Sequence, residues 1–195
     1  MPNRVRILAL VALLVCAVAV MNGCDAPAAA TPTPEPTAIP GSESVTATLR
    51  TYYDPAGRFT IGYPPSWEVS EGEQQVEFIE PYGNLHILVQ YADAGQVMDE
   101  TMMRTLIDQY FATEEAKGVG NFTREKETAL DSSTIRVEYS FLTGEVPGYG
   151  RSTFQQRGTY LYVLSFWVQQ RDLWAANETF FATVAQTLMP TPPSP

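Results

Sequence analysis

Hydrophobic and polar residues alternate along most of the chain after residue 46, in the pattern that half-buried strands require. The clearest alternation covers residues 135–141, where one face is apolar and the other is polar. Residues 159–169 are apolar on both faces, which predicts a strand that is covered on both sides. With the turn sequences between them, these runs predict strands at 48–53, 59–63, 67–69, 76–80, 85–91, 122–130, 135–141, 151–157 and 159–169.

Two segments instead repeat their apolar residues at helical spacing. Between residues 97 and 116 the spacing includes Ile107, and between 171 and 188 it includes Phe181, with Pro190 ending the second helix. The order is strands, helix, strands, helix, with short hairpin connections. It predicts an α+β domain, with a mostly antiparallel β-sheet on which the helices pack.

The start of the chain has the layout of a signal peptide. Arg4 and Arg6 precede an uninterrupted apolar run at residues 7–20. As a helix this run would span about 21 Å, whereas the hydrocarbon core of a bilayer is about 30 Å thick. A cleaved export signal is therefore favoured, and a membrane-spanning helix is the alternative.

The end of the apolar run resembles the lipobox of bacterial lipoproteins, in which a small residue precedes a cysteine. Gly23 and Cys24 match that pattern, whereas Met21 and Asn22 depart from it. The resemblance implies that residues 1–23 are a lipoprotein signal peptide. It also implies that Cys24 carries a diacylglycerol with acyl chains such as palmitate, which anchor the protein on the extracytoplasmic face of the cell membrane. The alternative is a signal cleaved elsewhere, with an incidental cysteine.

Residues 24–45 follow as a spacer rich in Pro, Thr and Ala. Proline removes amide donors and fixes the backbone near polyproline II, so this stretch favours neither helix nor sheet. We expect it to be a tether, with a proline-rich ligand motif as the alternative. The patterned domain then covers residues 46–189, and residues 190–195 are expected to be a disordered proline-rich tail.

The segment 59–69, FTIGYPPSWEV, resembles the opening signature of PsbP-like proteins. In that family an F-x-I-x-Y-P strand ends in a proline turn that leads to a tryptophan strand. The order of elements from residue 49 to 188 also resembles the family's fold, an antiparallel sheet sandwiched by helices. The resemblance implies a non-catalytic binding or assembly module. Packing alone also explains the motif, because Phe59 and Tyr63 share a strand face and Trp67 can cover a core edge.

The charge of the chain argues against nucleic acid as a partner. There are 12 basic and 22 acidic residues, and the formal net charge is −10. Phosphate backbones are bound by Lys and Arg, so a strongly acidic protein repels them. Both cysteines, Cys16 and Cys24, precede the domain, which therefore has no disulfide framework and no thiol chemistry.

Motifs that carry chemistry are missing from the domain. His86 is the chain's one histidine, and no G-x-S-x-G sequence accompanies it, so a hydrolytic triad is not indicated. Zinc would need several Cys or His ligands. Carboxylates that could gather near one sheet edge come without a calcium-loop motif; they are Glu71, Glu73, Glu77 and Glu80. The pairs Gly118–Gly120 and Gly148–Gly150 are interpreted as turn residues with positive φ.

These observations predict no catalytic, cofactor-binding or metal-binding residues and no cofactor; Cys24, as the lipidation site, is the one functional residue. We expect a membrane-tethered, non-enzymatic binding or assembly module for an unknown protein or small molecule, with a tyrosine-lined groove at Tyr149 as one candidate site. The alternative is a cell-surface hydrolase whose carboxylates converge only in the fold. Solute capture for a transporter is a third hypothesis, although one small domain lacks two closing lobes.

Overall fold

The computed structural model describes residues 48–116 and 120–191. The predicted signal peptide, Cys24 and the predicted spacer lie outside the described residues. Neither helix in the described part of the chain is long and apolar enough to cross a membrane. The elements are β1 (Arg50–Tyr53), β2 (Phe59–Tyr63), β3 (Glu68–Glu71), β4 (Gln75–Ile79), β5 (Leu85–Asp93), α2 (Glu100–Ala116), β6 (Gly120–Asp131), β7 (Thr134–Thr143), β8 (Val146–Arg157), β9 (Tyr160–Val168), α3 (Asp172–Thr187) and β10 (Met189–Pro190).

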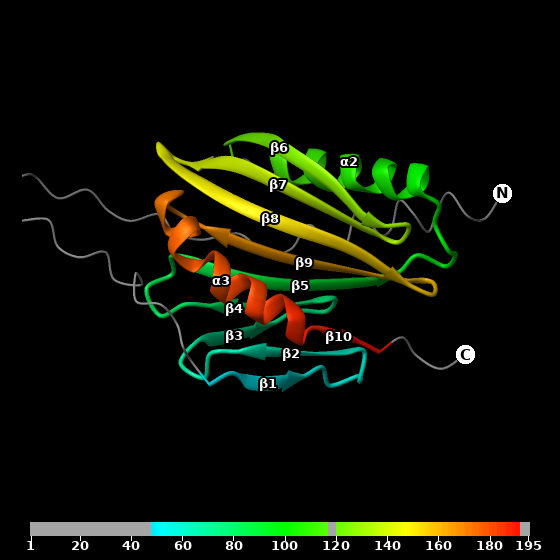
Figure 1. Ribbon diagram of the computed structural model, residues 1–195, viewed down its shortest axis with the longest axis horizontal. Helices are drawn as coiled ribbons and strands as arrows, with labels where there is room; N and C mark the ends of the chain where they lie inside the picture. The colour runs from blue at the N-terminus through cyan, green and yellow to red at the C-terminus, as the bar shows by residue number, and fades with distance from the viewer. Residues whose placement is uncertain (1–47, 117–119, 192–195) are drawn as a thin grey trace, which may run out of the picture.

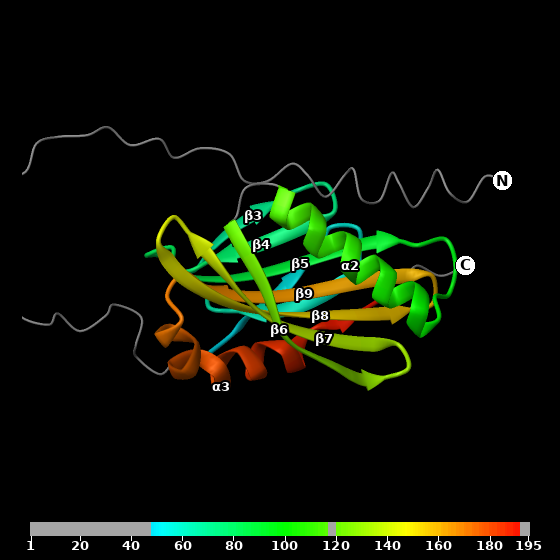
Figure 2. The same ribbon diagram turned by 90° about the horizontal axis from the view of Figure 1, so that it is seen from above.

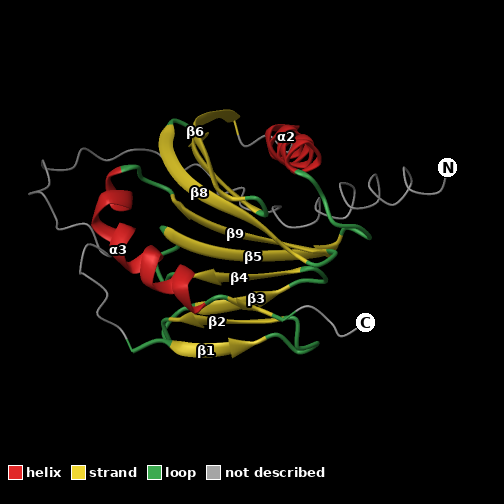
Figure 3. Cartoon of the chain, turned by 45° about the vertical axis from the view of Figure 1, so that its right-hand side comes forward, coloured by secondary structure: helices red, strands yellow, loops and turns green. Residues whose placement is uncertain are grey.

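The strands form two antiparallel sheets, as Figure 1 shows. A seven-stranded sheet has the order β3-β4-β5-β9-β8-β7-β6, and a three-stranded sheet has the order β1-β2-β10. Helices α2 and α3 lie on opposite sides of the large sheet (Figures 2 and 3). The predicted α+β architecture, a mostly antiparallel sheet sandwiched by helices, is therefore confirmed.

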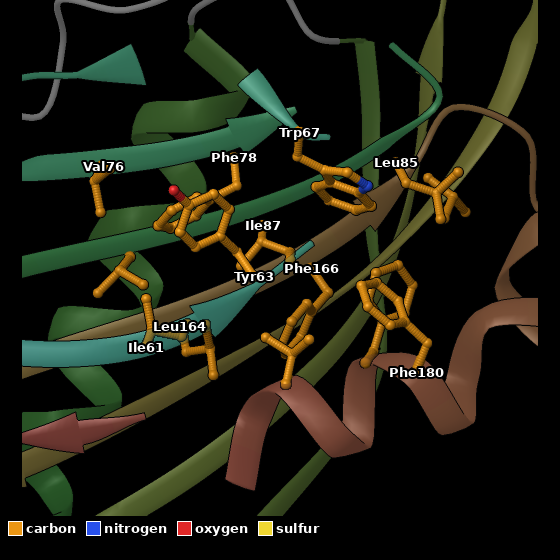
Figure 4. Close-up of a cluster of buried hydrophobic side chains, with 14 of the residues drawn as sticks. Ile61, Tyr63, Trp67, Val76, Phe78, Leu85, Ile87, Leu164, Phe166 and Phe180 are labelled. Atoms are coloured by element: carbon orange, nitrogen blue, oxygen red, sulfur yellow. The ribbon is translucent and has the colours of Figure 1, made fainter. Parts of the chain in front are cut away.

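The larger core lies between the large sheet, the small sheet and α3. Alternate residues of β5 and β9 point into it, because side chains along a strand alternate between the two faces. Ile87, Leu164 and Phe166 meet Ile61 of β2 there, and Figure 4 shows these side chains converging. Burial of this much apolar surface is what holds the small sheet and α3 against the large one.

A second core lies under α2. Met103, Ile107 and Phe111 are buried on one side of the helix, as the helical spacing predicts. They pack on the apolar face of β7 and on Phe154 of β8. Since β9 contributes buried residues to both cores, the prediction of a strand covered on both faces is confirmed; those facing α2 include Leu161 and Val163.

The F-x-I-x-Y-P segment acts as a packing motif. Phe59, Ile61 and Tyr63 are all buried on the inner face of β2. The amide of Trp67 donates to the carbonyl oxygen of Pro64 at 3.0 Å, which closes the proline turn. The turn places the Trp67 indole 5.5 Å from the ring of Phe180 in α3, centroid to centroid (Figure 4).

Two expectations are corrected. Gly148 and Gly150 lie inside β8, neither has a positive φ, and β8 starts at Val146 rather than at Arg151. These glycines leave room for the rings of Phe141 and Tyr139, their cross-strand partners on β7. At the end of the described chain, β10 pairs with β2 through Met189–Pro190, so the sheet includes Pro190, one residue beyond the boundary drawn from the sequence.

Candidate functional site

The candidate site is the side of β6, β7 and β8 that faces away from α2. Helix α3 packs on β2 and β9, and β7 lies two strands from β9 in the large sheet, so the helix borders this surface without covering β7. We call the surface the polar sheet face. It consists of Glu125, Lys126 and Thr128 of β6, Arg136, Glu138 and Ser140 of β7, Tyr149, Arg151, Thr153 and Gln155 of β8, Arg171, and Glu178 of α3.

Strand register sets the order of charges on the polar sheet face. Lys126, Glu138 and Arg151 lie side by side across three strands. One pair of residues further along, Arg136 lies between two neutral residues, Thr128 and Thr153. Directly opposite residues on one face are close enough to interact. Glu138 is therefore flanked by two cations, whereas Arg136 has no carboxylate directly across from it.

Tyr149 supports the polar sheet face from its edge. Its hydroxyl donates to Oε2 of Glu138 at 2.8 Å, and its ring lies 4.8 Å from that of Trp174. Burial, followed by the hydrogen bond to Glu138, raises the pKa of the Tyr149 hydroxyl well above its ordinary value. The phenol therefore stays a proton donor that fixes the Glu138 carboxylate. Only 7% of Tyr149 is exposed, so it does not present the open tyrosine-lined groove that we considered.

Arg151 joins the strands to α3. Its Nη2 lies 2.8 Å from Oε1 of Glu178 and 3.5 Å from Oε1 of Glu138. Its guanidinium also lies over the Trp174 ring, 5.0 Å from the centroid. A guanidinium that binds two carboxylates and stacks on an aromatic ring is held in one position. The side chain of Arg151 is 17% exposed, so part of this fixed charge remains available at the surface.

Arg171 closes the same edge. Its Nη1 and Nη2 donate to the two oxygens of Glu125 at 2.6 and 2.9 Å, in the bidentate geometry that suits a carboxylate. These hydrogen bonds lower the pKa of Glu125. The guanidinium of Arg171 also lies 4.8 Å from the centroid of the Tyr149 ring. The polar sheet face thus has a rigid border made of paired charges.

Arg136 and Lys126 differ from these paired cations. Neither makes an ion pair within residues 48–116 and 120–191. Lys126 is exposed, and Arg136 is half-buried with an Nε that has no hydrogen-bond partner in the described structure. A partly buried charge without a partner is costly, which makes it a good binding group for an incoming anion.

The glutamates considered for ion binding do not converge. Glu71 accepts a hydrogen bond from the Tyr52 hydroxyl at 2.9 Å, and Glu80 accepts the backbone amides of residues 82 and 84. Glu77 binds the ring of His86. The described residues contain no group of three or more His, Cys, Asp or Glu side chains that could hold a metal ion.

His86 has structural partners on both ring nitrogens. Nδ1 lies 2.8 Å from Oε1 of Glu77, and Nε2 lies 3.0 Å from the carbonyl oxygen of Gly83. The ring stacks on Trp167, with centroids 4.7 Å apart. These contacts tie the β4–β5 turn to the sheet.

The polar sheet face was not predicted as a unit from the sequence. Arg136 and Glu138 were on the predicted wet face of their strand, and that alternation was the available signal. Their neighbours on β8 and α3 could not be assigned without the register.

The fold that these elements build is that of PsbP-like proteins, as the resemblance in the 59–69 segment implied. The solution structure of cyanobacterial PsbP (CyanoP) from Synechocystis sp. PCC 6803 matches with a TM-score of 0.58 and 16% sequence identity, covering 74% of this chain and 94% of that one. The Saccharomyces cerevisiae Ran-binding protein Mog1p matches with a TM-score of 0.56 and 9% identity, covering 75% and 97%. No protein-family model and no curated protein matches the sequence.

Proposed function

We propose that this protein is an exported lipoprotein, held on the membrane through lipid on Cys24, whose single domain is a non-enzymatic binding or assembly module. We also propose that the polar sheet face is its binding surface. The observation that carries this is a rigid, charged sheet face that α3 borders and does not cover. A fold shared with a Ran-binding protein supports a binding role.

The chemistry of the surface favours binding over catalysis. The three carboxylates of the polar sheet face, Glu125, Glu138 and Glu178, are each within 3.5 Å of an arginine nitrogen. A general acid or base must exchange its proton with a substrate, and a carboxylate that an arginine neutralises is poorly suited to that task. Fixed, paired charges instead give a surface the geometry that selects one partner over another.

The sequence before the domain supports the membrane tether. The spacer of residues 24–45 contains five prolines, two of them in consecutive Thr-Pro steps. At about 3.1 Å per residue, an extended polyproline II chain of this length reaches roughly 60 Å. Such a tether would let the domain meet a partner beyond the lipid headgroups.

Site-specific crosslinking in producing cells tests the binding surface. A photo-reactive phenylalanine analogue is placed at Ser140 or Thr153 of the polar sheet face, and at Thr105 on the exposed side of α2 as the matched control. We expect one crosslinked species from both face positions and none from the control position. Crosslinks that appear equally at all three positions, or at the control alone, would refute this surface as the site.

An assay for hydrolytic turnover distinguishes the binding module from the hydrolase alternative. If the purified protein cleaves a panel of p-nitrophenyl glycosides and esters, and Glu138→Gln abolishes the cleavage, the non-enzymatic proposal is wrong. We expect no turnover above that of the Glu138→Gln variant.

A further inference from the structure

Positive charge is concentrated on the polar sheet face of a chain that is otherwise acidic. Four of the chain's 12 basic residues lie on this face, but only three of its 22 acidic residues do. The basic residues are Lys126, Arg136, Arg151 and Arg171. The face is therefore weakly positive, while the whole chain has a formal charge of −10. An anionic partner is attracted to this face and repelled by the rest of the molecule.

Within the face, the charges that remain to be neutralised are next to each other. Arg171 is already paired with Glu125, and Arg151 with Glu138 and Glu178. The two cations of the face without an ion pair in the described structure are Lys126 and Arg136. They lie on adjacent strands as diagonal neighbours, because Lys126 is opposite Glu138 and Arg136 is opposite Thr128. Neighbouring residues on one sheet face are separated by about 5–8 Å, which matches the spacing of carboxylates along a peptide.

We propose that the partner presents an acidic peptide segment, whose carboxylates bind Arg136 and Lys126 on the polar sheet face. This inference rests on the proposed function and specifies the partner of the same surface. The Nε of Arg136 is buried without a hydrogen-bond partner in the described structure, but its two terminal nitrogens are not, and together they can donate to a carboxylate in bidentate geometry. Pairing would also relieve the cost of a half-buried, unpaired charge.

The shape of the surface favours a peptide over a membrane or a nucleic acid. The face is three strands wide, and strands are spaced about 4.8 Å apart, so it is roughly 10–15 Å across. That width fits one peptide segment. A lipid bilayer or a duplex would extend past the face onto the acidic remainder of the protein, where its phosphates would be repelled.

Binding of a fluorescein-labelled peptide of ten glutamates to the full chain in detergent tests the proposal. Fluorescence anisotropy would be measured for the native protein and for Arg136→Gln, Lys126→Gln and the double variant. The control is Arg50→Gln, which removes an exposed arginine on β1, away from the face. We expect about a tenfold loss of affinity for Arg136→Gln, as for removal of one charge-assisted contact, and no change for Arg50→Gln.

Two further measurements make the result decisive. Circular dichroism melting curves establish that each variant is folded before its affinity is compared. Amide chemical shifts of the labelled protein locate the decaglutamate, and we expect them to move in β6–β8 and not in α2. Binding that weakens with added salt would agree with a charged contact.

Three outcomes would overturn the proposal. The decaglutamate could fail to bind, or it could bind the double variant as tightly as the native chain. Alternatively, phosphatidylglycerol vesicles or duplex DNA could bind in its place with the same dependence on Arg136. If the crosslinks from Ser140 and Thr153 persist in any of these cases, the surface remains the binding site and only the acidic class of partner is wrong.

Discussion

At the scale of single residues, Asp54 and Arg58 fix the turn between β1 and β2. The Asp54 carboxylate is buried and accepts three hydrogen bonds from Arg58, one from the backbone amide and two from the guanidinium, at 2.7–3.0 Å. The guanidinium also lies 3.8 Å from the centroid of the Tyr91 ring, which belongs to the large sheet. One ion pair therefore closes a turn and connects the two sheets.

This ion pair predicts a loss of stability in acid. Burial by itself would raise the pKa of Asp54, but the hydrogen bonds and charge of Arg58 outweigh it and lower that pKa. A lowered pKa stabilises the fold above the ordinary value near 4, and this stabilisation is lost as the pH falls through the folded-state pKa. Asp54→Asn should cost about 2–3 kcal/mol at pH 7, and the difference from the native protein should shrink below about pH 4.

Urea unfolding at pH 7, 5, 4 and 3 measures this difference. Glu68→Gln, at an exposed carboxylate of β3, is the control and should change stability little at any of these pH values. A difference between Asp54→Asn and the native protein that stays constant down to pH 3 would contradict the assignment.

At the scale of elements, two aromatic rings of β7 pack over glycines on the neighbouring strand β8. Tyr139 lies opposite Gly150 and Phe141 opposite Gly148, and a Cβ at either glycine would overlap the opposite ring. The rings cover the glycine backbone and extend the core under α2, since Phe111 of the helix packs on Tyr139. The two strands thus gain apolar contact at positions where β8 has no side chain of its own.

Gly150→Ala should therefore destabilise the protein by about 2 kcal/mol, because the Tyr139 ring must move out of a packed core. Tyr139→Ala removes the ring, and in that background Gly150→Ala should cost much less. The double-mutant cycle by urea unfolding measures the coupling. Additive losses in the cycle would mean that the ring does not determine the need for glycine.

The tryptophan turn makes a second prediction at this scale. Trp67 is 7% exposed and packs on Phe180, so it joins β2 and β3 to α3. Trp67→Ala should lower the free energy of unfolding by about 3–4 kcal/mol, and Trp67→Phe should lose less than half as much. Urea unfolding measures both variants. If Trp67→Ala were as stable as the native protein, Trp67 would not contribute to packing as we infer.

Sequence patterns could predict elements whose information is local. The alternation in β7 gave its wet face, with Arg136 and Glu138, and helical spacing gave the buried side of α2. Register between strands is not local, so the meeting of Glu138 with Arg151 was not predictable. Strand β10 was not predicted for a similar reason. It has two residues, one of them a proline, and they form a strand only because they pair with the edge of β2.

At the scale of the whole molecule, the proposed binding surface lies far from the point where the described chain begins (Figure 1). The polar sheet face lies at the β6 side of the large sheet, and the chain enters the fold at β1 in the small sheet. Figure 1 shows these at opposite ends of the molecule. A partner on the face would therefore not obstruct the tether that we propose.

Cys24→Ala tests the anchor independently of the domain. We expect mass spectrometry of the membrane-extracted native protein to find an acylated N-terminus at Cys24, and the variant to lose both the lipid and membrane association. Its affinity for the decaglutamate should be unchanged, because the face lies in the domain. A native chain that keeps its first 23 residues without acylation would instead mean a membrane-spanning anchor.

β2 pairs with β1 along one edge, and its other edge contacts residues near the end of the described chain. Pro190 of β10 pairs with Phe59. The hydroxyl of Thr187 in α3 accepts a hydrogen bond from the amide of Gly62 at 2.7 Å, and the amide of Thr191 donates to the carbonyl oxygen of Arg58. Gly62 and Thr187 are 125 positions apart in the sequence. Closing so long a loop costs conformational entropy, so we expect the contacts of β2 with α3 and β10 to form late in folding.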